Sequence, residues 1–153
     1  MTEQERDLGR RWFEEVWNKG RREAVAEMLL PESVLHEAGV DSVGREGFYP
    51  HYDRLRAAFS ESHFDIDDSL ASEDTICVRW VFTGKHTGEG LGVSPSGKAI
   101  TVTGITIMRV ANGMLIEGWQ NWDMLGLMQQ IQGGHKAATY VAASSAISAA
   151  SGS

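Results

Sequence analysis

Two long stretches of alternating apolar and polar residues, 75–86 and 99–110, constrain the fold of this chain more than any other feature. Side chains of a β-strand point alternately to opposite faces of a sheet, so each stretch predicts a strand with one buried face. Residues 63–70 and 115–122 have the same period, and Asn112-Gly113 is a typical two-residue hairpin turn. In residues 75–86 the apolar face consists of Ile76, Val78, Trp80, Phe82 and His86. The second half of the chain is therefore expected to form an antiparallel sheet.

The first half of the chain has the period of helices. Residues 2–17 carry apolar side chains at i, i+4 spacing, and Thr2 with Glu5 fits a capping box. We expect a second short helix before Pro31, a brief strand over residues 33–38 and a third helix over residues 47–59. Pro50 lies either in the first turn of this third helix or at a kink in it. The order predicts the α+β class, with helices on one side of a curved antiparallel sheet.

The length and composition indicate one domain followed by a tail. The chain has 153 residues, and we expect the domain to span residues 1–134. Residues 135–153 are rich in Ala and Ser, which bury too little apolar surface to fold alone.

The charges and the cysteine count exclude several classes of protein. The net charge is −7 and no segment is basic enough to form a nucleic-acid-binding face. The single cysteine, Cys77, excludes a disulfide framework, and the five histidines lack metal-ligand spacing, so we expect neither metal nor cofactor. No signal peptide and no run of about 18 apolar residues is present. We therefore expect a cytoplasmic protein with no membrane partner.

Three side chains are candidates for chemistry. Asp123 directly precedes the last predicted helix and follows Trp122, so it is either a helix N-cap or a general base whose pKa is raised by apolar neighbours. His36 shares a strand face with Val34 and Ala38, where it is either a core histidine or a proton-transfer group. His86 ends the strand 75–86, where it lies either in a surface loop or at the mouth of a pocket.

Several segments together resemble the SnoaL-like polyketide cyclase family, within the NTF2-like (ketosteroid-isomerase-like) superfamily. They are RWFEEVWNKG, His36, GKHTGEGLGVSPSGKAITVTGITIMRV and NGMLIEGWQNWDMLGLMQQI, and the resemblance covers residues 5–132. It implies an α+β cone, in which a strongly curved antiparallel sheet wraps around a deep apolar pocket closed by helices.

The resemblance also implies a function, namely cofactor-independent aldol ring closure of a hydrophobic, polyketide-like substrate. Asp123 matches the aspartate that acts as acid/base in this family, with His36 as a second catalytic group. Under this hypothesis Asp123 is buried at the pocket wall. The substrate would contact His86, Trp80, Trp119, Phe59, Tyr52 and Met108.

Two other functions remain open at this point. The same pocket could support epoxide hydrolysis, isomerisation or dehydration. For epoxide opening, Arg79 or Arg109 would have to face inward between two carboxylates. Alternatively, the protein binds a small molecule without catalysis.

We also expect a homo-oligomer, with a dimer as the first expectation. The outer face of strand 75–86 is partly apolar and would be covered by a second copy of the sheet. It carries Thr75, Cys77, Arg79, Val81 and Thr83.

Overall fold

The alternating segments form a six-stranded sheet in the order β2-β1-β6-β5-β4-β3 in the computed structural model, which describes residues 1–133. All neighbouring strands are antiparallel except β1 and β6, which are parallel. The strands are β1 (Leu29–Glu37), β2 (Val40–Val43), β3 (Phe59–Ser72), β4 (Thr75–His86), β5 (Ala99–Ala111) and β6 (Met114–Trp122). The predicted tail, residues 135–153, lies outside the described residues.

Two of the hairpins have left-handed residues in their turns. Asn112 and Gly113 have φ of 51° and 77°, as the sequence predicts for the turn between β5 and β6. Ala38 and Gly39 have nearly the same angles and join β1 to β2. The strand β2 was not predicted, and the turn removes Ala38 from the strand face on which it was expected.

The helices are α1 (Glu3–Arg6), α2 (Leu8–Arg11), η1 (Trp12–Asn18), α3 (Ala24–Met28), α4 (Gly44–Ala58) and α5 (Met124–Gln132). The predicted capping box of Thr2 and Glu5 is present, but the helix expected over residues 2–17 continues as a π-helix in η1. Helix α4 begins three residues earlier than predicted, so Pro50 lies inside it.

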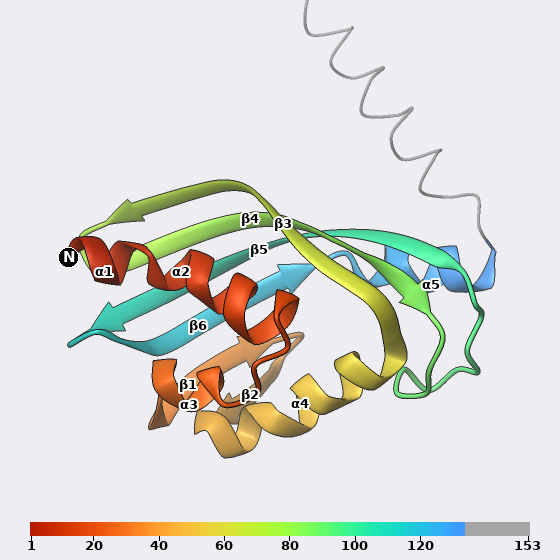
Figure 1. Cartoon of the computed structure of the whole chain (residues 1–153), viewed down its shortest axis with the longest axis horizontal. Coiled ribbons are helices and arrows are strands. Elements are labelled where there is room, and N and C mark those ends of the chain that lie inside the picture. The colour runs from red at the N-terminus through yellow and green to blue at the C-terminus, as the bar shows by residue number, and fades with distance from the viewer. Residues whose placement is uncertain (134–153) are drawn as a thin grey trace, which may run out of the picture.

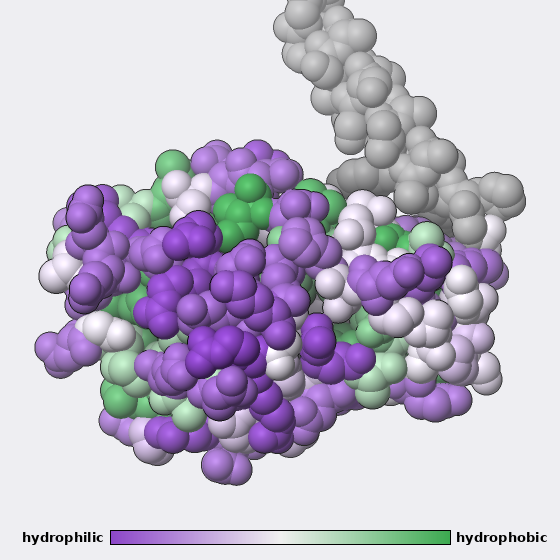
Figure 2. Space-filling view, viewed as in Figure 1, coloured by the Kyte–Doolittle hydropathy of each residue, from purple (hydrophilic) through white to green (hydrophobic). Residues whose placement is uncertain are grey.

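The curved sheet bends over the N-terminal helices and α4, and α5 lies at the end of the sheet remote from the N-terminus (Figure 1). The concave face of β4 carries Ile76, Val78 and Trp80, which pack in one core cluster with Phe13 and Val16. The face seen in Figure 2 is mostly hydrophilic, with apolar side chains in small separate groups. The α+β class and the NTF2-like architecture expected from the sequence are confirmed.

Candidate functional site

A cavity of about 600 Å³ lies on the concave side of the sheet, between the sheet and α4. Its walls are mainly apolar and aromatic, as in most small-molecule sites. Trp12, Trp17, Phe48, Met108, Trp122 and Met128 are among the apolar lining residues. The polar lining residues include His36, Glu37, His51, Arg54, Thr106, Glu117 and Gln120.

Glu37 and His51 meet at the wall of this cavity. Glu37 ends β1, and His51 lies on α4, directly after Pro50. The Oε2 atom of Glu37 is 3.1 Å from Nε2 of His51, and both side chains are largely buried. The alignment of these atoms falls short of a hydrogen bond, so Nε2 of His51 is a buried polar atom without a partner among residues 1–133. A ligand oxygen could supply that partner.

The other carboxylate oxygen of Glu37 is held by two donors from β6. Trp122 donates its indole N–H to Oε1 at 2.6 Å, and Gln120 donates from Nε2 at 3.1 Å. The parallel pairing of β1 with β6 places Glu37 beside Gln120 and so creates this contact. Oε1 is therefore fixed, while Oε2 faces only His51 and the cavity.

This carboxylate is linked to the core by a chain of hydrogen bonds. Gln120 accepts through Oε1 from the Thr106 hydroxyl at 2.9 Å. The Thr106 hydroxyl in turn accepts from the indole N–H of Trp80 at 2.9 Å. Because every link lies on a strand, the chain limits the freedom of the Glu37 side chain.

The protonation of His51 follows from its surroundings. Burial lowers the pKa of His51 below 6.5, which keeps the ring neutral near pH 7, although the Glu37 carboxylate opposes the shift. Arg54 lies 3.2 Å from Nδ1 of His51, and a guanidinium can only donate. Nδ1 must therefore accept, and the single ring proton is on Nε2, beside Glu37.

His36 borders the same cavity, but its ring is fully engaged. Nδ1 contacts Asp41 at 2.6 Å and Nε2 contacts Glu117 at 2.9 Å. Hydrogen bonding to Glu117, and then to Asp41, raises the pKa of His36 above 6.5. The ring also stacks on Trp119, at 5.3 Å between centroids. With both nitrogens bound to carboxylates, the ring has no free lone pair to accept a proton.

Asp123 does not lie where the sequence-based hypothesis required. It is exposed, does not line the cavity, and accepts a hydrogen bond from the backbone N–H of Gly126 as the N-cap of α5. The expected burial of Asp123 is wrong because β6 ends at Trp122, so the next side chain falls outside the concave face. The acid/base role depended on that burial, and we do not assign it to Asp123.

The other predicted site residues divide into three groups. Trp119 and Met108 line the large cavity, whereas Trp80 and Phe59 line a second, smaller one. His86 and Tyr52 line neither.

The positions of His86 and Tyr52 correct two expectations. His86 is fully buried, packs on Phe59 and bonds Ser96 through Nδ1, so it lies neither in a surface loop nor at a pocket mouth. Tyr52 points into the core, where its hydroxyl donates to the carbonyl of Val16 at 3.0 Å.

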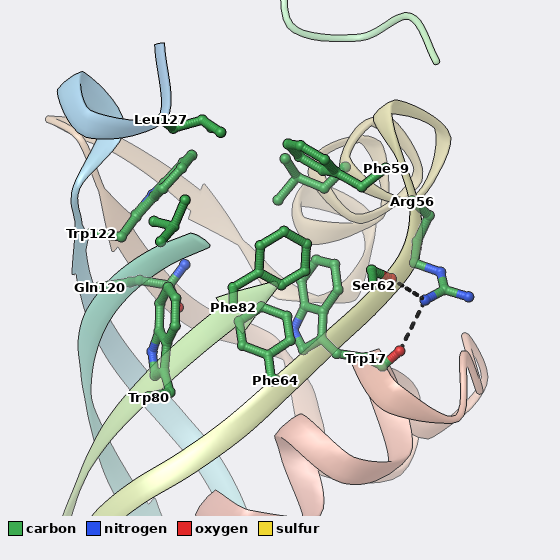
Figure 3. Close-up of a pocket in the computed structure, with 12 residues that line it drawn as sticks. Trp17, Arg56, Phe59, Ser62, Phe64, Trp80, Phe82, Gln120, Trp122 and Leu127 are labelled. Carbon is green, nitrogen blue, oxygen red and sulfur yellow. Dashed lines mark hydrogen bonds between the residues drawn. The ribbon is translucent and has the colours of Figure 1, made fainter. Parts of the chain in front are cut away.

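The smaller cavity, of about 40 Å³, lies beside the large one (Figure 3). The two share four lining residues, namely Trp17, Leu55, Gln120 and Trp122. Most of its remaining wall is aromatic or aliphatic, from Phe59, Phe64, Trp80, Phe82, Val102 and Leu127.

Sequence reasoning missed Glu37, His51 and Arg54, although one signal was available. His51 lies three residues after Phe48 and four before Leu55, so it falls on the apolar stripe of its helix. A histidine on such a stripe is expected to be buried. Nothing in the local sequence pairs it with Glu37, because that pairing depends on where α4 crosses β1.

The arginines required for epoxide opening do not face the cavity. Arg79 is exposed and pairs with Asp67 at 3.0 Å. Arg109 is also exposed and lies over the ring of Trp119. Within residues 1–133 there is no cluster of three or more potential metal ligands. No helix of the described part is long and apolar enough to cross a membrane.

The sequence profile described as SnoaL-like polyketide cyclase matches residues 8–131. Among solved structures, a candidate SnoaL-like polyketide cyclase from Jannaschia sp. CCS1 is 26% identical, with a TM-score of 0.79 over 85% of this chain and 92% of that chain. A candidate polyketide cyclase from Acidithiobacillus ferrooxidans is 28% identical, with a TM-score of 0.75 over 86% and 96%. A ketosteroid isomerase-like protein from Catenulispora acidiphila, at 16% identity, 78% and 87% coverage and a TM-score of 0.66, shares the fold. No curated protein matches the chain.

Proposed function

Because the chain belongs to the SnoaL-like polyketide cyclase family, we propose that it closes a ring in a hydrophobic, polyketide-like substrate by acid/base catalysis at Glu37 and His51. The observation that carries this proposal is the contact between Oε2 of Glu37 and Nε2 of His51 at the wall of the apolar cavity. Half of the family assignment is thus a fold, and the other half is this pair.

In the proposed reaction Glu37 is the general base. Its Oε2 removes a proton from a carbon that lies between two carbonyl groups, and the resulting enolate carbon attacks a third carbonyl of the same molecule. One carbon–carbon bond forms, one carbonyl π-bond breaks, and the new alkoxide takes up the proton held by Glu37. The substrate and its ring-closed product are isomers, so the step requires no co-reactant.

His51 is proposed to polarise a substrate carbonyl. Its Nε2–H is buried and unpartnered among residues 1–133, and a donor in a water-poor cavity stabilises a developing enolate. Arg54 acts through His51, because its donation to Nδ1 keeps the proton on Nε2. Arg54 is therefore a positioning residue in this mechanism.

The test is turnover by the Glu37→Gln variant. The purified protein would be screened against aromatic β-dicarbonyl compounds and simple epoxides. Glutamine keeps an oxygen that can accept from Trp122 but cannot take a proton, so the fold should persist while turnover falls by about 10²–10⁴-fold. Glu117→Gln is the matched control, because Glu117 borders the same cavity but is paired with His36.

The Asp123→Asn variant separates the structural assignment from the sequence-based one. Asparagine still caps α5, and Asp123 lies outside the cavity, so turnover should stay within about threefold. A large loss in Asp123→Asn with retained turnover in Glu37→Gln would contradict our assignment. Turnover of epoxides alone would contradict the ring-closing reaction, and ligand binding without any turnover would indicate a non-catalytic binder.

A further inference from the structure

The smaller cavity is enclosed mostly by aromatic rings. In Figure 3, Phe59 and Phe82 approach it from one side, and Trp122 and Leu127 approach it from the other. A cavity of about 10–15 Å³ holds one water molecule, so 40 Å³ has room for roughly three non-hydrogen atoms.

The polar side chains at this cavity already have partners in the protein. The guanidinium of Arg56 donates to the carbonyl of Trp17 at 2.9 Å and to the Ser62 hydroxyl at 3.4 Å (Figure 3). The amide of Gln120 is bonded at both ends, to Thr106 and to Glu37.

The two indole N–H groups at this wall are likewise engaged. Trp80 donates to Thr106 and Trp122 donates to Glu37. A water molecule here would find few polar groups to bind, and apolar cavities of this kind stay dry and accept apolar ligands. The chemistry of the walls therefore favours a hydrocarbon group.

The position of the cavity connects it to the proposed acid/base pair. Gln120 and Trp122 border both cavities, and both donate to Oε1 of Glu37. A molecule that reacts at Glu37 thus lies against the side chains that separate the two spaces. A substituent a few bonds from the reacting carbon would reach the smaller cavity.

We propose that the smaller cavity is a side pocket for a short alkyl group of the substrate, from methyl to propyl. The inference rests on the proposed function for its link to Glu37, but the binding itself can be measured without turnover. It assigns Val102 and Leu127 as residues that limit the length of this alkyl group.

The experiment is a binding series with 2-naphthol and its 6-methyl, 6-ethyl, 6-propyl and 6-pentyl derivatives. Binding would be measured by calorimetry and by quenching of the cavity tryptophans. Each carbon that enters the pocket should tighten binding about fourfold, the equivalent of about 0.8 kcal/mol per buried methylene. The gain should stop once the pocket is full, so the pentyl derivative should bind no better than the propyl derivative.

Two variants fill the pocket from different walls. Val102→Ile adds one methylene from β5, and Leu127→Phe enlarges a side chain of α5. Each should reduce the alkyl gain by at least about fourfold while leaving the affinity for 2-naphthol itself within about twofold. Val110→Ile is the matched control, because Val110 is a buried valine of the same strand that lines neither cavity.

The outcomes separate this inference from the proposed function. Equal affinity across the series, or the same effect from Val102→Ile and Val110→Ile, would overturn the side pocket alone. Failure of every naphthol to bind would overturn both the side pocket and the cavity as a substrate site. The Glu37→Gln variant should keep the alkyl preference, because the pocket does not depend on proton transfer.

Discussion

His36 and His51 border one cavity, yet their environments shift their pKa values in opposite directions. Hydrogen bonds to two carboxylates stabilise the charged form of His36 and raise its pKa. Burial and the neighbouring Arg54 disfavour the charged form of His51 and lower its pKa. One ring is therefore a fixed cation near pH 7 and the other a neutral donor.

The first prediction concerns the pH dependence of stability. Folded His36 binds its proton more tightly than unfolded His36, so its contribution to the free energy of unfolding is complete below about pH 6.5. That contribution is lost as the pH rises through the folded pKa, which lies above 6.5. The difference in unfolding free energy between the wild type and His36→Gln should therefore be larger at pH 5.5 than at pH 9. Urea titrations at both pH values would measure it.

The opposite sign applies to His51. Unfolded His51 binds its proton more tightly, so His51 makes the fold less stable as the pH falls below about 6.5. His51→Gln should then lose less stability on acidification than the wild type. An NMR titration gives a direct check, because the His36 ring should titrate above 6.5 and the His51 ring below it. Both rings titrating on the same side would contradict these assignments.

The candidate site shows why single residues were harder to predict than faces. The concave face of β4 could be read directly from alternation, and it is buried as expected. Asp123 could not be placed this way, because its exposure depends on β6 ending one residue earlier. The pair of Glu37 and His51 depends on tertiary contacts between β1, β6 and α4, which no local pattern encodes.

At the scale of elements, β4 and β5 fit together through a missing side chain. Gly104 of β5 pairs with Trp80 of β4, and a Cβ atom on Gly104 would lie within 2.2 Å of the Trp80 indole. That indole donates to Thr106, at the start of the hydrogen-bond chain to Glu37. The glycine thus allows the tryptophan to lie flat across the neighbouring strand.

The second prediction follows from this contact. Gly104→Ala should displace the indole of Trp80 and lower the free energy of unfolding by about 1–3 kcal/mol, the usual cost of overpacking. Gly84→Ala is the control, because Gly84 lies in β4 and a Cβ there would meet its neighbours only at 3.4 Å or more. Urea unfolding followed by tryptophan fluorescence would measure both variants. Equal changes in stability for the two would refute the steric role of Gly104.

Strictly periodic elements could be predicted almost to the residue, and irregular ones could not. The bounds of β4 match the prediction, and those of β5 and β6 differ by one residue. The strand β2 is too short to show a period, with only four residues, and it pairs only with β1. The start of α4 was missed because Gly44, a poor helix former, begins it after the turn.

At the scale of the whole molecule, the outer face of the sheet carries an apolar row that crosses four strands. Leu70 pairs with Cys77, Cys77 with Ile107, and Ile107 with Trp119. Directly paired residues lie on the same face of a sheet, so these side chains form one band. Leu70 is 65% exposed and Ile107 is 39% exposed. Such a band on a regular, well-ordered face favours contact with a second copy.

The last prediction is that the protein forms a two-fold symmetric dimer through this band. At micromolar concentration, light scattering should give about twice the 16.8 kDa mass of the chain. Ile107→Lys places a charge near the centre of the band, and a two-fold axis would bring two such charges together at a cost of several kcal/mol. The dissociation constant should then rise at least tenfold, which corresponds to about 1.4 kcal/mol. Leu125→Lys is the control, because Leu125 is an exposed leucine of α5, and a wild-type mass near 16.8 kDa would contradict the dimer.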